Sequence, residues 1–164
     1  MNTNTPEIKI YVANLAQYNS GILKGSWLTL PIQEDELQAK INKVLGTDEG
    51  YAIHDYSADF YIGEYTSVFE LNNIAEVIKD DNSMAQFCHL INEGYSIEQA
   101  LEKYEDVIYY ADMTLRDVAE ELVEEGHYGE IPEKLQYFID YDAIAQSLDN
   151  EGYAETKKGV FFYN

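Results

Sequence analysis

The sequence has little of several residue types on which common protein classes depend. Cysteine occurs once, as Cys88, which excludes an intrachain disulfide and a cysteine-based zinc motif. Proline occurs three times, and no stretch is rich in proline, glycine or serine, so we identify no flexible linker. No apolar run approaches the roughly 18 residues of a membrane-spanning helix. The start of the chain, MNTNTPEIKIYV, lacks the basic and apolar parts of a signal peptide, so we expect a cytoplasmic protein.

Basic side chains are also scarce. The chain has 10 Lys and Arg residues against 31 Asp and Glu, for a net charge of −21, and Arg116 is the only arginine. Nucleic acids and anionic lipids are bound by basic surfaces, so this charge excludes both as direct partners. Hydrophobic residues make up 46% of the chain and include 15 tyrosines, which predicts a folded core rather than disorder.

Sequence patterns of enzymes and metal sites are absent as well. The three histidines, His54, His89 and His127, do not have the spacing of a zinc site. No phosphate-binding loop, dinucleotide fingerprint or Ser-His-Asp motif occurs. Carboxylate pairs are inevitable among 31 acidic residues, but nothing marks one pair as the acid and base of a hydrolase. We therefore predict neither an enzyme nor a cofactor.

Hydrophobic patterning divides the chain into three parts. Residues 1–61 contain two strand patterns, a helix over 34–46 and a third strand pattern at 51–56, with 18–25 as a connecting loop. Residues 62–103 have the pattern of three short helices. Residues 104–164 return to mixed structure. We therefore predict an elongated α+β chain of three small subdomains: mixed, helical and mixed.

Capping residues predict where several helices begin. Ser67, Ser83 and Ser96 are each followed three residues later by Glu or Gln, as in a capping box. In the third segment Thr114 precedes a helix that continues to Glu125, and Pro132 precedes another. Asp142 is the expected cap of the helix after that. The final residues predict a hairpin that turns near 157–159.

The stretch DVAEELVEEGHYGEIPE, residues 117–133, carries seven acidic residues and no base. On a helix, Leu115, Val118, Ala119, Leu122 and Val123 share one face, while the acids at 117, 120, 121, 124 and 125 share the other. Five acid pairs then have i,i+3 or i,i+4 spacing and oppose the helix by roughly 1–2.5 kcal/mol in total. Selection for stability alone would favour lysine at some of these positions.

A row of carboxylates has a charge density close to that of DNA. The acids at 117–125 extend over about 12 Å of helix axis. Duplex DNA carries one charge per about 1.7 Å of axis, or about seven over that length. The acidic face is therefore either solvated without a partner or presented to a groove that binds phosphates.

Four stretches resemble one protein family: YVANLAQYNSGILKGSWLTLP (11–31), YAIHDY (51–56), EYTSVFELN (64–72) and VAEELVEEGHYGEIPEKLQYFIDYDAIAQSL (118–148). They are similar to the ArdA antirestriction proteins that mobile genetic elements carry. The resemblance implies a homodimeric DNA mimic that fills the DNA-binding groove of type I restriction–modification enzymes. The implied partner is the methyltransferase core of such an enzyme, together with its specificity subunit. Restriction is blocked, and the effect on modification is open. One departure is Gln146–Ser147, where an Arg-Asp pair is expected.

The candidate residues form two sets. The carboxylates expected to meet the target are Glu64, Glu70, Glu76, Asp112, Asp117, Glu120, Glu121, Glu124, Glu125, Glu130, Glu133, Asp140 and Asp142. The residues considered for a dimer interface are Leu115, Leu122, Val123, Tyr128 and Ile131, although an apolar stripe at helical spacing more often belongs to a core.

Two other interpretations stay open at this point. An acidic interaction module could inhibit a different basic DNA-binding protein. A salt-adapted surface would spread its acids evenly, whereas residues 104–164 hold 15 acidic and four basic residues, or −11 of the total −21.

Overall fold

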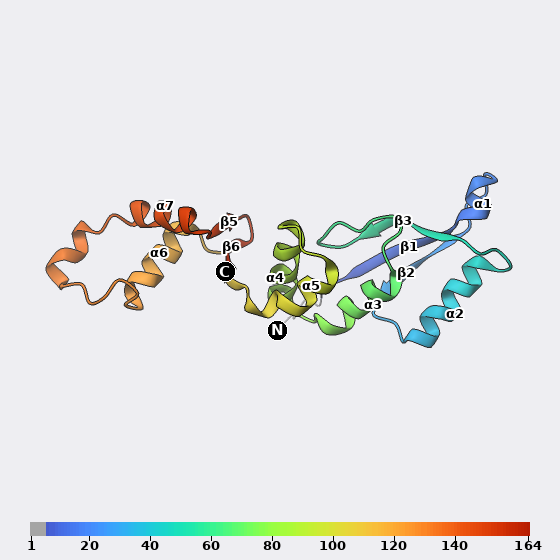
Figure 1. The fold of residues 1–164 in the computed structure, drawn as a ribbon, viewed down its shortest axis with the longest axis horizontal. Helices are drawn as coiled ribbons and strands as arrows, with labels where there is room; N and C mark the ends of the chain where they lie inside the picture. Colours follow the sequence, from blue (N-terminus) through green and yellow to red (C-terminus); the bar gives the residue numbers. More distant parts are fainter. Residues whose placement is uncertain (1–5) are drawn as a thin grey trace.

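A computed structural model describes residues 6–164 as an elongated α+β fold (Figure 1). Two three-stranded sheets lie at different positions along the long axis, with the helices α4 (Asp81–Asn92) and α5 (Ile97–Lys103) between them. The predicted fold class is therefore confirmed. Residues 1–5 lie outside the described residues. They begin the predicted first subdomain, and the expectation about a signal peptide partly depends on them.

The first sheet has the strand order β2-β1-β3, with both pairs antiparallel. Its elements are β1 (Ile8–Asn14), α1 (Leu15–Asn19), β2 (Gly25–Leu30), α2 (Glu34–Leu45) and β3 (Tyr51–Ser57). The five-residue helix α1 extends into the stretch expected to be a loop. Asn14 begins this helix because its side-chain oxygen accepts a hydrogen bond from the Gln17 amide at 3.1 Å.

The helices α3 (Val68–Val77), α4 (Asp81–Asn92) and α5 (Ile97–Lys103) follow. Ser67 and Ser96 cap α3 and α5, as predicted. The predicted cap at Ser83 is wrong, because α4 begins earlier and Asp80 accepts a hydrogen bond from the Ser83 amide at 2.8 Å. The Ser83 hydroxyl donates to the same carboxylate, so Ser83 hydrogen-bonds to the N-cap residue Asp80 and is not itself the cap.

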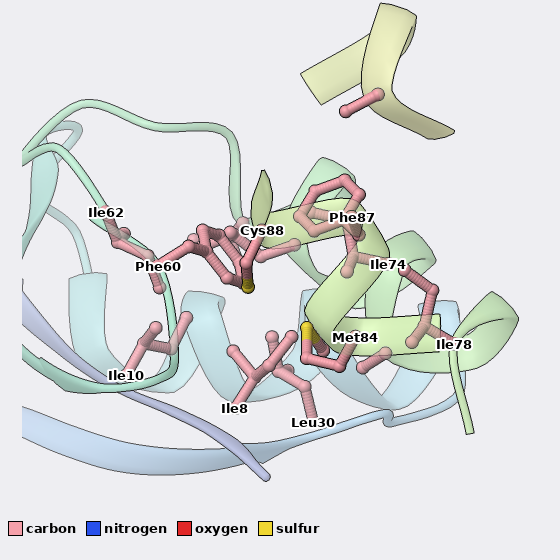
Figure 2. Packing of buried hydrophobic residues seen from close by; sticks show 14 of the residues in the cluster. Ile8, Ile10, Leu30, Phe60, Ile62, Ile74, Ile78, Met84, Phe87 and Cys88 are labelled. Atoms are coloured by element: carbon pink, nitrogen blue, oxygen red, sulfur yellow. The ribbon is translucent and has the colours of Figure 1, made fainter. Parts of the chain in front are cut away.

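One hydrophobic core joins the first sheet to the middle helices. Figure 2 shows Ile8 and Leu30 from the sheet beside Met84 from α4, and Ile10 and Phe87 belong to the same cluster. Phe60, which follows β3, packs edge-on against Phe87 with 5.3 Å between ring centroids. No separate core therefore begins at residue 62, and the division into three subdomains stays a prediction.

The last part of the chain has its own smaller core. After the 3-10 helix η1 (Tyr104–Asp106), the sheet order is β4-β6-β5. Its core consists of Val118, Ala119, Leu122, Leu148 and Val160. The remaining elements are β4 (Ile108–Ala111), α6 (Leu115–Glu124), η2 (Glu133–Phe138), α7 (Tyr141–Glu151), β5 (Ala154–Thr156) and β6 (Gly159–Phe162).

The connection from α6 to α7 forms a wide excursion at one end of the molecule, drawn in orange (Figure 1). The helix expected after Pro132 is only the 3-10 helix η2, and none of its residues is buried. A helix whose apolar side chains find no core gains little from burial, which explains the shorter element. Among residues 6–164 we find no helix with the length and hydrophobicity required to cross a bilayer.

Candidate functional site

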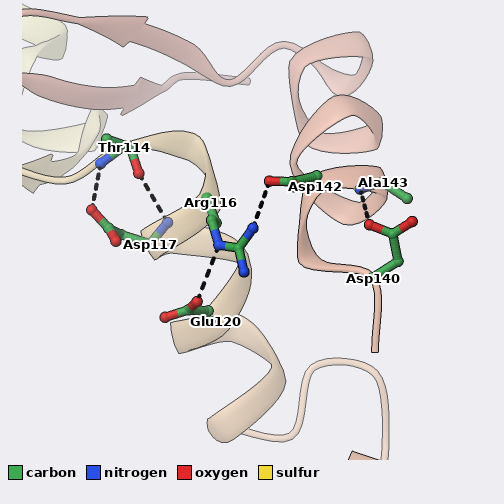
Figure 3. Close-up of polar contacts among 7 residues, drawn as sticks. All are labelled: Thr114, Arg116, Asp117, Glu120, Asp140, Asp142 and Ala143. Atoms are coloured by element: carbon green, nitrogen blue, oxygen red, sulfur yellow. Dashed lines mark hydrogen bonds and ion pairs between the residues drawn. The ribbon is translucent and has the colours of Figure 1, made fainter. Parts of the chain in front are cut away.

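The acidic helix α6 starts at a complete capping box. The Thr114 amide donates to Asp117 Oδ2 at 2.9 Å, and the Asp117 amide donates to Thr114 Oγ1 at 3.1 Å (Figure 3). Hydrogen bonding of the Asp117 carboxyl to Thr114, first to its backbone amide and then to its side chain, lowers the pKa of that carboxyl. Asp117 therefore has a structural role in addition to its charge.

The two faces of α6 separate less completely than the helical pattern predicts. Val118, Ala119 and Leu122 are buried, while Glu124 and Glu125 are exposed. Glu120 and Glu121 are half-buried, and Glu121 Oε2 is shielded from solvent with no hydrogen-bond partner in the described part of the chain. The five carboxylates of the acidic face are therefore unequally exposed, with Glu120 and Glu121 less accessible than Glu124 and Glu125.

Arg116 supplies a base that the stretch 117–133 lacks. Its Nε lies 3.4 Å from Glu120 Oε1, and its Nη1 donates to Asp142 Oδ1 at 2.9 Å (Figure 3). The guanidinium also lies over the Tyr141 ring, 5.9 Å from its centroid. The only arginine of the chain thus connects α6 to α7 and compensates charge at Glu120 and Asp142.

Asp140, rather than Asp142, caps α7. Its Oδ1 accepts a hydrogen bond from the Ala143 amide at 3.0 Å. The expectation that Asp142 caps this helix is wrong, and Asp142 is instead held by Arg116. Four of the candidate carboxylates therefore also stabilise the last part of the fold: Asp117, Glu120, Asp140 and Asp142.

The other candidate carboxylates of this part are exposed. Glu124, Glu130 and Glu133 have no ion-pair partner in residues 6–164, and Glu125 Oε2 lies 3.5 Å from His127 Nε2. Asp112 is also exposed, in a turn with a positive φ of 59°. Glu124, Glu125 and Glu130 line a shared recess beside Ile131. This end of the molecule therefore presents several unneutralised carboxylates.

The candidates in the middle part of the chain are exposed too, but they are not adjacent in sequence to the C-terminal group. Glu64 follows β3 and lies 3.6 Å from His54 Nε2, and Glu70 and Glu76 belong to α3. Glu76 lines a groove with Glu34 and Asp35, from the first turn of α2. The sequence analysis did not select these two acids, although the first turn of a helix favours acidic residues.

The residues considered for a dimer interface do not share one environment. Leu122 is not available for an interface, because it is only 4% exposed and belongs to the core of this part. Leu115 packs against that core. Val123 and Ile131 line the recess beside the acids. Tyr128 is 50% exposed.

The most exposed apolar side chains of the last part lie in η2, which the sequence analysis did not select. Leu135 is 53% exposed, Phe138 80% and Tyr137 93%. In the sequence, the apolar and aromatic residues of this stretch predicted a helix packed on a core. The structure places these side chains where no core covers them.

Two observations concern the cysteine and the possible metal ligands of the described residues. Burial raises the pKa of the Cys88 thiol to about 12, which keeps it protonated. Within residues 6–164, no group of three or more His, Cys, Asp or Glu side chains could hold a metal ion.

Comparison with known proteins gives one finding. The protein family described as "Antirestriction protein (ArdA)" matches residues 10–162, which is nearly the whole chain. A comparison with curated proteins gives no match.

Proposed function

Because the chain belongs to the ArdA family of antirestriction proteins, we propose that it occupies the DNA-binding groove of type I restriction–modification enzymes as a mimic of bent duplex DNA. Membership in this family of inhibitors implies an antirestriction function against type I restriction–modification. The mimicry and the occupied groove are our proposal. It includes no catalytic step, since a filled groove excludes DNA without any reaction.

The observation that supports mimicry most strongly is the exposed negative charge along an elongated fold. The net charge is −21, and exposed carboxylates occur in α2, α3, α6 and the excursion that follows α6. A basic groove that binds phosphates would attract these carboxylates and release their counterions, as it does with DNA. The cost of like-charge repulsion within the free protein would then be offset in the complex.

The groove that cleavage requires also positions DNA for methylation if both activities use one specificity subunit. We therefore propose that modification is blocked together with restriction. An assay of methyl transfer in the presence of the protein tests this part independently of cleavage.

We further propose that two copies form a homodimer through the last part of the chain. Two copies carry −42, twice −21, so charge repulsion opposes their association and the interface needs apolar area. Tyr128, Leu135, Tyr137 and Phe138 supply exposed apolar area at one end of the molecule. A dimer joined at that end would double the length of the acidic array.

A competition assay tests the proposed function. A purified type I restriction–modification complex is bound to labelled duplex DNA and titrated with this protein at two salt concentrations. We expect displacement near one dimer per DNA site, with weaker competition at the higher salt concentration because surface charges are screened. No displacement from an active complex would contradict the proposal, and an unrelated DNA-binding protein serves as the specificity control.

Charge variants then test whether the C-terminal carboxylates take part. Replacing Glu124, Glu125, Glu130 and Glu133 by Gln removes four exposed charges, and we expect unchanged folding with weaker competition. Single replacements should have small effects, because each exposed charge contributes little. Unimpaired competition by the fourfold variant would remove this surface from the proposed contact.

A further inference from the structure

A cavity of about 610 Å³ lies where the middle helices meet the last part of the chain. Its lining residues come from three stretches that are distant in sequence: 89–99, 149–154 and Tyr163. The charged residues among them are Glu93 and Asp149, and the lining contains no lysine or arginine. The cavity does not overlap the recess beside Glu124, so it is a separate feature of the surface.

Two helix C-termini meet at this cavity. Helix α4 contributes His89, Leu90 and its C-cap Glu93, and helix α7 contributes Asp149 and its C-cap Gly152. The end of a helix carries a partial negative charge, which lysine or arginine in the last turn would normally balance. Neither helix has lysine or arginine in its last turn. The last turn of α4 contains His89, and burial lowers the pKa of this histidine. The helix ends therefore add to the negative potential of the two carboxylates.

Three tyrosines also line the cavity. Tyr95, Tyr153 and Tyr163 lie in the wall, and Tyr153 stacks on Phe162 with 4.2 Å between centroids. Lys103 Nζ lies 5.4 Å from the centroid of the Tyr95 ring, so one of these rings already binds a cation within the protein. A wall of tyrosine rings beside carboxylates suits a planar organic cation better than a hydrated metal ion.

From these features we propose that the cavity binds the guanidinium group of an arginine side chain from the basic protein that this chain inhibits. Guanidinium stacks on aromatic faces, donates in a fork to carboxylates and is weakly hydrated, whereas an ammonium group is compact and strongly hydrated. The identity of the partner rests on the proposed function. The cavity would add a specific contact to a charged surface that otherwise acts through distributed attraction.

The first test titrates the full chain with N-acetyl-L-arginine amide and separately with N-acetyl-L-lysine amide, with amide NMR shifts as the measurement. We expect saturable shifts at Gly94 and Gly152, which line the cavity, and weaker binding of the lysine compound. The variant E93Q/D149N should weaken arginine-amide binding about three- to tenfold, since exposed charge pairs are individually weak. Shifts spread evenly over the surface, or binding unaffected by E93Q/D149N, would overturn the proposal.

The matched control is E98Q/E102Q, which removes two exposed charges of α5 that do not line the cavity. In competition with DNA for the restriction enzyme, E93Q/D149N should raise the half-inhibitory concentration more than this control. Equal effects of the two variants would overturn the role of the cavity and leave the proposed function intact. Arginine-amide binding without any inhibition by the wild-type chain would overturn the proposed function and the partner assignment with it.

Discussion

At the scale of single residues, Arg116 determines which carboxylates near the acidic helix α6 are neutralised by an ion pair. Its guanidinium contacts Glu120 and Asp142, which lie on different helices. Replacing Arg116 by Gln should loosen the contact between α6 and α7 and lower the melting temperature slightly. The same change frees two carboxylates, so we expect stronger competition with DNA and a steeper salt dependence. Weaker competition by a folded R116Q variant would show that the ion pairs position the surface.

Gly159 is a second position where one residue decides the local structure. Its φ is 143°, and a Cβ built there would overlap the Tyr110 carbonyl oxygen in the neighbouring strand. We expect Gly159→Ala to reduce the free energy of unfolding by at least about 2 kcal/mol, measured by urea denaturation. Gly50→Ala is the matched control, because its Cβ would meet Leu15 Cδ1 at an ordinary 3.5 Å. Similar losses in both variants would contradict this explanation.

At the scale of elements, a stack of three rings joins α4 to the second sheet. The His89 and Phe161 rings are 4.7 Å apart and nearly parallel, and Phe161 stacks on Tyr109 at 4.4 Å. Burial lowers the pKa of His89 from its ordinary 6.5, while the nearby Glu93 raises it by a smaller amount. The folded state therefore prefers neutral His89, and protonation favours unfolding.

The pH dependence follows from this direction. The contribution of neutral His89 is fully present above about pH 6.5 and is lost as the pH falls from there through the lowered pKa of the folded state. His89→Phe keeps a stacked ring without the titration. We expect the stability difference in favour of the variant to grow between pH 7 and pH 5 in parallel urea denaturations. A constant difference over that range would exclude His89 as the cause.

At the scale of the whole molecule, an acidic chain must offset repulsion before two copies can associate. Tyr137 and Phe138 are the most exposed aromatic residues of the last part, at 93% and 80%. If two copies associate as proposed, replacing both by Ser should shift the sedimenting mass from twice 18.8 kDa towards 18.8 kDa without unfolding the chain. Higher salt should favour the proposed dimer of the wild-type chain, because it screens the repulsion. A dimer unaffected by Y137S/F138S would place the interface elsewhere.

The sequence by itself determined the net charge, most of the strands and helices in their order, and several helix starts, including those at Thr114 and Ser96. These features depend on composition or on contacts within about four residues, so a linear pattern contains them. Only the tertiary structure decided that Arg116 reaches Asp142, 26 residues away, and that Leu122 belongs to the core. It also decided that one core extends across residue 61 and that the ends of α4 and α7 meet at a cavity. Packing brings together residues that no local periodicity relates, and it therefore selects which of many carboxylates remain free.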